Sequence, residues 1–334
     1  MVKYGSSTEE MRRHSPGLVH GLCVTVFAVM HVRLPLIACC FVGVLTGQPA
    51  TGQFVFKKDF TFEELPAGIE RRAAPGASNA EIQAMLSRQP SIVIDGAALV
   101  ISPPSVGSSR SIAVKSIEFR NGGRLVTNGV NLELDAGIIV SDRGAILSFD
   151  ESARQSTGQA GPGNSGKSGL SAGTVVMNAS IRANDILLVS LPGQDGQRGG
   201  SGAGGAAGAP GPRGENGADH LFDCAHGAGN GGNGSQGGKG GSGGDGGAGG
   251  NGGHLILRGE LAQKRVQIEF SALGGRGGDG GTGGPGGPGG AGGPGGSHTT
   301  YCRDGSPGAN GPVGPPGDPG RRGPEGQKGS ISSD

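Results

Sequence analysis

The sequence predicts a small all-β, solenoid-like domain followed by a bundle of three-fold extended, glycine-rich helices with β-hairpins between them. Short apolar runs separated by turn residues recur over residues 91–150, and glycine recurs at every third position over much of 158–334. The 334 residues include 75 Gly and 21 Pro, and only 33% are apolar. Globular domains have roughly 45–50% apolar residues, so one apolar core through the whole chain is excluded.

Residues 1–52 have the pattern of an export signal. His31 and Arg33 precede an apolar run over residues 34–45, and small residues follow it. We predict cleavage after Gly52, with Met30 as an alternative start of translation, and a secreted or cell-surface location. A membrane anchor is the alternative, but the apolar runs are shorter than the ~20 residues that a spanning helix needs.

Residues 53–157 are predicted to form a β-rich domain with one short helix. Strands are expected at 54–56 and 60–62. Ser78 or Asn79 can cap the helix, and Pro90 ends it. One face of this helix carries Ile82, Met85 and Leu86.

Residues 91–150 carry the clearest strand pattern. Their short apolar runs are separated by turn sequences at 121–123, 128–129 and 143–144. Strands this short and closely spaced indicate a β-solenoid or a small sandwich. We favour the solenoid because no alternation continues beyond five residues.

Residues 158–334 contain two hairpin-like repeats of about 80 residues. In each repeat a strand, a polar turn and a second strand lead into a glycine tract with two legs and an apex. The legs are residues 193–217, 231–252, 274–295 and 305–329, called legs one to four, with a shorter fifth leg at 158–169. The apices are residues 219–224 and 297–302, and each has a His four positions before a Cys. This shared spacing indicates a duplication.

Glycine at every third position fits an extended three-fold helix that rises about 3.1 Å per residue. Such a helix makes no internal hydrogen bonds, so its N–H and C=O groups must pair with neighbouring segments or water. Legs two and three read Gly-Gly-X, broken only by Ser235, whereas legs one and four carry bulky residues such as Arg198 and Arg321. We therefore expect legs two and three inside the bundle and legs one and four outside.

Two alternatives to an intrachain bundle remain. Residues 314–319 would suit a collagen triple helix of three chains, and glycine-rich tracts also form flexible linkers. The strict period argues against a linker, and legs of about eight triplets are short for a collagen stem. A monomer is therefore favoured, with a homotrimer as the alternative.

The Gly-Gly-X triplets of residues 274–279 resemble those of the polyglycine-II bundles of snow-flea antifreeze protein and phage tail-tip adhesins. Residues 305–329 resemble bacterial collagen-like surface proteins. The resemblance covers about half of the chain, roughly 158–330. It implies a polyglycine-II backbone but no single function, because these families include ice binders, receptor-binding adhesins and structural proteins.

The apices carry the two cysteines that remain after signal cleavage, Cys224 and Cys302. The other three cysteines, Cys23, Cys39 and Cys40, lie in the predicted signal. An even number in an exported chain predicts one disulfide. The alternative is a zinc site, since two Cys and two His are a common ligand set. Its ligands would be His220, Cys224, His298 and Cys302.

Three short motifs match catalytic or binding signatures without the surrounding structure these need. Residues 161–168 match a phosphate-binding loop, but no strand directly precedes them and glycines prevent a helix after them. Residues 240–244 match a hydrolase elbow without its strand-to-helix turn, and 243–247 lack the aliphatic position of calcium-binding repeats. We predict no enzyme activity, no nucleotide and no cofactor.

The function predicted is that of a non-catalytic structural protein that presents a rigid glycine-rich bundle outside the cell. The net charge of +1 comes from mixed basic and acidic residues, so nucleic acid is not expected as a partner. The main alternative is an adhesin or a receptor- or glycan-binding module that uses the apex loops. Its contact residues would be Leu221, Phe222 and Tyr301.

Ice binding and a trimeric stalk are less favoured functions. An ice-binding protein needs a flat face of small residues. The inner legs are interrupted by Lys239, Asp245, Arg276 and Asp279, so such a face would have to lie elsewhere.

Overall fold

The computed structural model describes residues 52–334 except 70–76, 102–107, 156–157, 183–184 and 264. The predicted export signal therefore lies outside the described residues, apart from Gly52. All the described residues belong to one compact unit, and the description below concerns this unit alone. Within the described ranges, no helix has the length and apolar character needed to cross a membrane.

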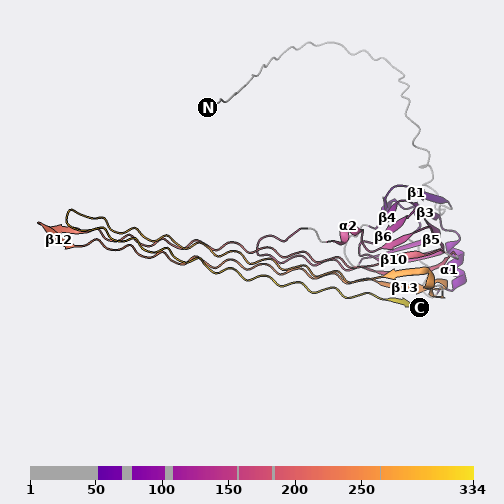
Figure 1. The fold of residues 1–334 in the computed structure, drawn as a ribbon. Helices are drawn as coiled ribbons and strands as arrows, with labels where there is room; N and C mark the ends of the chain where they lie inside the picture. Colours follow the sequence, from indigo (N-terminus) through magenta and orange to yellow (C-terminus); the bar gives the residue numbers. More distant parts are fainter. Residues whose placement is uncertain (1–51, 70–76, 102–107, 156–157, 183–184, 264) are drawn as a thin grey trace, which may run out of the picture. The chain divides into compact units, whose positions relative to one another are not determined.

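Two parallel sheets contain most of the regular secondary structure (Figure 1). The first has seven strands in the order β1 (Gln53–Phe56), β3 (Ser91–Asp95), β5 (Ser109–Arg120), β7 (Asn131–Ser141), β9 (Thr174–Ile181), β13 (His254–Arg258) and β15 (Ile331–Ser333). The second has six strands in the order β14 (Ile268–Ser271), β10 (Leu187–Ser190), β8 (Ala145–Leu147), β6 (Arg124–Val126), β4 (Ala98–Val100) and β2 (Phe60–Thr61). A separate antiparallel pair consists of β11 (Ala218–His220) and β12 (Asp223–His226).

The helices are short. They are α1 (Asn79–Leu86), α2 (Glu151–Arg154) and α3 (Glu260–Gln263), with 3-10 turns at Phe62–Glu64 and Arg265–Gln267. Helix α1 confirms the predicted helix: Ser78 is its N-cap and exchanges hydrogen bonds with Glu81 in a capping box.

The chain alternates between the two sheets, and each strand stacks on an earlier strand of its own sheet. One column of aligned residues in the second sheet contains Phe60, Leu99, Leu125, Ile146 and Val189. All five are buried. Columns of this kind form the core between the sheets, which excludes water from large apolar side chains.

The predicted turns of this region are confirmed. Asn121, Asn128 and Arg143 have φ of 52°, 48° and 55°. Asparagine tolerates this left-handed conformation better than most residues do. These turns carry the chain from β5 to β6, from β6 to β7 and from β7 to β8.

The predicted fold class is wrong. The regular structure is two parallel sheets with few helices, and not an all-β domain followed by a helix bundle with interleaved β-hairpins. Strands β9 and β10 belong to different sheets, and so do β13 and β14. The reason is that β9 pairs with β7, whereas β10 pairs with β8. Each of the two strands therefore extends the sheet of its own partner, and the two do not pair with each other. Both sheets therefore continue past residue 158, where the composition changes.

The glycine legs between these strands are extended segments that contain no assigned helix or strand (Figure 1). They lie side by side, and backbone N–H groups at every third residue donate to carbonyls of a neighbouring leg. For example, Gly281 in leg three donates to Gly244 in leg two over 2.8 Å. Leg one also pairs with legs two and three, and leg four pairs with legs two and three.

Asn and Asp side chains fix the register between legs two and four. Four of them accept a hydrogen bond of 2.7–2.9 Å from the N–H of the residue 76 positions later. These pairs are Asn230 with Ser306, Asn233 with Ala309, Asp245 with Arg321 and Asn251 with Gln327. Leg four has proline, which has no N–H, opposite Gln236, Lys239 and Ala248.

Candidate functional site

The candidate site is the tip of the legs, formed by β11, β12 and the loop at residues 297–304. A disulfide joins Cys224 in β12 to Cys302 in the loop, with an S–S distance of 2.00 Å. Cys302 is buried, with 5% of its surface exposed. The structure therefore contains the cysteine pair that the sequence predicts, and the bond holds the two apices together.

Asp219 in β11 ties the loop to the antiparallel pair beside the disulfide. Its carboxylate accepts hydrogen bonds from the Thr299 hydroxyl and from the N–H groups of Thr300 at 3.0 Å and Tyr301 at 3.3 Å. Sequence reasoning missed this residue. The available signal was an acidic residue close before the cysteine of the first apex.

A second carboxylate stabilises the same loop. Asp304 accepts hydrogen bonds from the backbone N–H of His298 at 2.6 Å and lies 2.9 Å from its Nδ1. These hydrogen bonds favour the ionised carboxylate and hold the pKa of Asp304 below its usual value. The loop at residues 297–304 is thus stabilised by Asp304, which belongs to it, and by Asp219, which belongs to β11.

Three large side chains of the tip face solvent. Leu221 and Phe222 form the turn between β11 and β12 and are 79% and 81% exposed. Leu221 has the unusual φ of 39°, so the turn holds it in a left-handed conformation. Tyr301 is 48% exposed. At these exposures, the three side chains do not bury one another beside the disulfide.

The two cysteines of the tip are not free to serve in the alternative zinc site. Zinc binds cysteine as the thiolate, whereas the sulfurs of Cys224 and Cys302 are bonded to each other. His298 is engaged with Asp304. Across the described part of the chain, no group of three or more His, Cys, Asp or Glu residues is placed to hold a metal ion.

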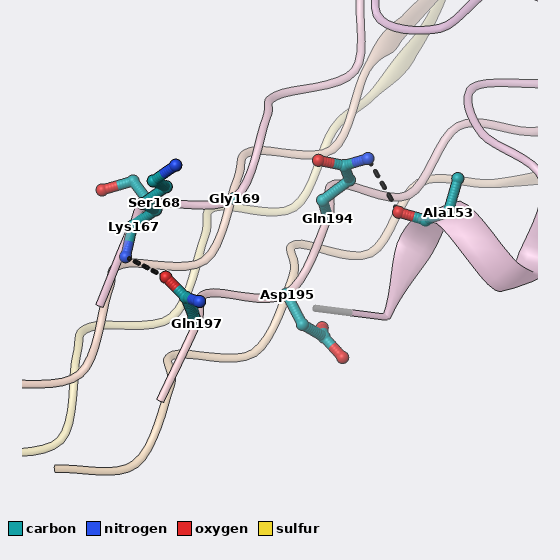
Figure 2. Close-up of a pocket in the computed structure, with 7 residues that line it drawn as sticks. All are labelled: Ala153, Lys167, Ser168, Gly169, Gln194, Asp195 and Gln197. Carbon is teal, nitrogen blue, oxygen red and sulfur yellow. Dashed lines mark hydrogen bonds between the residues drawn. The ribbon is translucent and has the colours of Figure 1, made fainter. Parts of the chain in front are cut away.

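A shallow polar hollow of about 260 Å³ lies where the fifth leg meets leg one (Figure 2). It is lined by Ala153, Lys167, Ser168, Gly169, Gln194, Asp195 and Gln197. Figure 2 shows that the Lys167 N–H donates to the Gln197 side chain and the Gln194 amide to the Ala153 carbonyl. The phosphate-loop match at 161–168 runs beside this hollow, and the next element after it is strand β9. The phosphate-loop match therefore does not open a helix whose N-terminus could hold a phosphate.

The comparisons with known proteins identify no family. No family model matches the chain, and no curated protein matches it. Among solved structures, it is similar to a springtail antifreeze protein from Granisotoma rainieri, described as a nine polyproline type II helical bundle. The identity is 27% over 49% of this chain and 96% of that chain, with a TM-score of 0.09. This likeness is too weak to support a fold or a function.

Proposed function

We propose that the protein is a secreted or cell-surface, non-catalytic protein whose sheets and glycine legs hold a binding tip. The observation that carries this proposal is the turn of β11 and β12, where Leu221 and Phe222 are 79% and 81% exposed. Exposed apolar side chains on a fixed turn are typical of contact sites. The disulfide and Asp219 limit the entropy that the tip would lose on binding, which favours affinity.

The proposed unit is a monomer with a partner outside the cell. The leg-four glycines donate to leg three of the same chain, as Gly317 does to Gly284 over 2.8 Å. These groups are therefore already paired, and a triple helix of three chains would have to break that pairing. Aromatic residues at the tip suit a protein or a glycan partner.

Changing Leu221, Phe222 and Tyr301 together to Ala is expected to weaken binding at least about 30-fold, since exposed anchors contribute 2 kcal/mol or more in many interfaces. The measurement is binding of the labelled protein to a glycan array and to immobilised extracellular-matrix proteins. The melting temperature should not change, because these side chains are exposed. Binding that survives the triple substitution would refute the proposed tip site.

Ice binding is a second candidate function, favoured by one side of legs one and three. Between Arg198 and Arg213 of leg one, the outward residues are small and uncharged: Ser201, Gly204, Ala207 and Pro210 of leg one, and Thr282, Pro285, Pro288 and Ala291 of leg three. Lys239 and Asp245 belong to leg two, where each pairs toward leg four. Arg276 and Asp279 lie beyond the uncharged run of leg three, toward the sheets.

This second candidate predicts thermal hysteresis at sub-millimolar protein. Replacing Ala207 with Arg should abolish the hysteresis, because a long charged side chain would break the flat face. The variant with three Ala residues at the tip should keep it. Hysteresis that is absent from the wild type, or unchanged by Ala207→Arg, would eliminate this function.

A further inference from the structure

Legs one and two together can pair with a further extended segment that runs alongside both of them, and we call the line of positions for this segment the row. In the structure, a segment of the chain occupies only part of the row. Residues 164–172, which overlap the predicted fifth leg at 158–169 and are called the short leg below, occupy the end of this row nearest the sheets. The Gly166 N–H of the short leg donates to Asp245 of leg two over 2.8 Å, and the short leg accepts from Gly200 of leg one at Asn164 over 2.8 Å. Toward the tip, the short leg ends in a turn in which Asn164 donates to Gly161.

The same row continues past this turn with unused backbone groups. The next donors in leg one are the N–H groups of Ala203 and Ala206, and the next acceptors in leg two are the carbonyls of Ser242 and Lys239. None of these four groups pairs with any residue in the described part of the chain. Ala203 and Ala206 follow Gly200 by three and six residues, and Ser242 and Lys239 precede Asp245 by the same intervals. The unpaired groups therefore continue the three-residue spacing of the groups that pair with the short leg.

The glycines of leg two show the same change along the row. A Cβ on Gly244 would lie 1.9 Å from the Asn164 carbonyl oxygen of the short leg. On Gly241 and Gly238, the nearest atoms to a Cβ belong to leg one, at 3.0 and 3.2 Å. These two glycines therefore form a floor that the short leg does not cover, and the turn before the short leg reaches it only at Ser242, whose carbonyl oxygen would lie 3.6 Å from a Cβ on Gly163.

Only a glycine-repeat peptide fits such a row. In the short leg, a Cβ on Gly166 would lie 1.9 Å from the Gln197 carbonyl oxygen, and one on Gly169 would lie 2.1 Å from that of Gln194. Real Cβ atoms do not approach backbone this closely. An occupant of the open part must therefore have glycine at every third residue.

Ser235 limits how long the occupant can be. It takes the place of a glycine in leg two, and its Oγ accepts the Ala209 N–H over 2.7 Å. This hydrogen bond satisfies the donor that would form the next rung. The open part therefore spans about two triplets, which is roughly 19 Å in a three-fold helix.

We propose that this open row is a binding site for an extended peptide with glycine at every third residue, which docks as a continuation of the short leg. The peptide donates to the Ser242 and Lys239 carbonyls and accepts from the Ala203 and Ala206 N–H groups. Its backbone supplies the hydrogen bonds and its glycines supply the fit, as in strand addition to a sheet edge.

The experiment uses a blocked synthetic peptide of two triplets with the sequence of residues 166–171, added to protein labelled with ¹⁵N-alanine. We expect saturable shifts of the Ala203 and Ala206 amides with a Kd of about 1 mM. The Ala309 amide, which already donates to Asn233, should not move. A peptide with Ala in place of the glycine equivalent to Gly166 should bind at least 10-fold more weakly.

Two variants test the position. Gly238→Ser should close the row as Ser235 does and weaken binding at least 10-fold, while Ser235→Gly should lengthen it and strengthen binding of a longer repeat. Unchanged alanine spectra outside the row establish that each variant folds. The absence of shifts at Ala203 and Ala206 up to about 5 mM peptide would overturn the proposal. So would a shift of Ala172 without them, because the peptide would then be displacing the short leg.

Discussion

Gly281→Ala is expected to destabilise the glycine legs by more than about 3 kcal/mol. A Cβ at this position would lie 1.9 Å from the carbonyl oxygen of Gly200 and 2.5 Å from its carbonyl carbon. Both are backbone atoms of leg one, so no rotamer change can relieve the clash. Leg three is also bonded to leg two through the Gly281 N–H, so moving it apart would break that hydrogen bond.

Thermal unfolding of Gly281→Ala and of a matched control measures this effect. The control is Gly204→Ala, because the nearest atom to a Cβ at Gly204 is the Pro285 Cγ at 3.8 Å. An alanine with room around it should be neutral or stabilising by about 0.4–1 kcal/mol. Equal melting temperatures for the two variants would contradict the close contact of legs one and three.

The period of three predicts the legs, their extended form and their need for neighbours, because glycine at a fixed interval serves only a repeated close approach. It does not predict register. The pairing of Asn233 with Ala309 depends on the alignment of legs two and four, which the period of three leaves open. Leg four has proline opposite Gln236, Lys239 and Ala248, where leg two has no Asn or Asp to accept an N–H. This correspondence can be recognised only when the alignment of the two legs is known.

The sequence could not predict the parallel sheets correctly. A strand, a short polar turn and a second strand read the same whether the second strand returns beside the first or crosses to another sheet. In β9 the buried residues are Val175, Met177, Ala179 and Ile181, which alternate as either arrangement requires. The decision depends on β7 and β8, which lie 30 or more residues earlier and offer parallel edges.

At the tip, the two cysteines that lie outside the predicted signal predict the disulfide, because they leave one possible pair. The acidic residues that fix the loop were missed, because Asp219 and Asp304 resemble the many solvated carboxylates of the glycine region. Asp219 accepts from the N–H of Thr300, which belongs to the other apex, and Asp304 accepts from the N–H of His298 within its own tight loop. Sequence reports the side chains but not which donors a turn leaves unpaired.

Removing the disulfide with Cys224→Ala and Cys302→Ala together is expected to lower the free energy of unfolding by about 4 kcal/mol. The bond joins residues 78 positions apart, so it constrains a long loop of the unfolded chain. In the folded chain, Asp219 still holds the loop through Thr299, Thr300 and Tyr301, so the tip should keep its shape. Alanine avoids placing a polar group at the buried Cys302 position.

The measurement is the melting temperature of the wild type and the double variant, each with and without reductant. A loss of about 4 kcal/mol corresponds to a fall of about 6–7 °C in a chain of this size, because the unfolding entropy is about 2.1 cal/mol/K per residue. Reductant should lower the wild type to the value of the double variant and should not affect the variant. If reductant leaves the melting temperature of the wild type unchanged, the disulfide has no effect on the unfolding step that sets this temperature. The tip would then separate from the legs before the sheets unfold, and the legs would depend for their stability on the backbone pairing that Gly281→Ala tests.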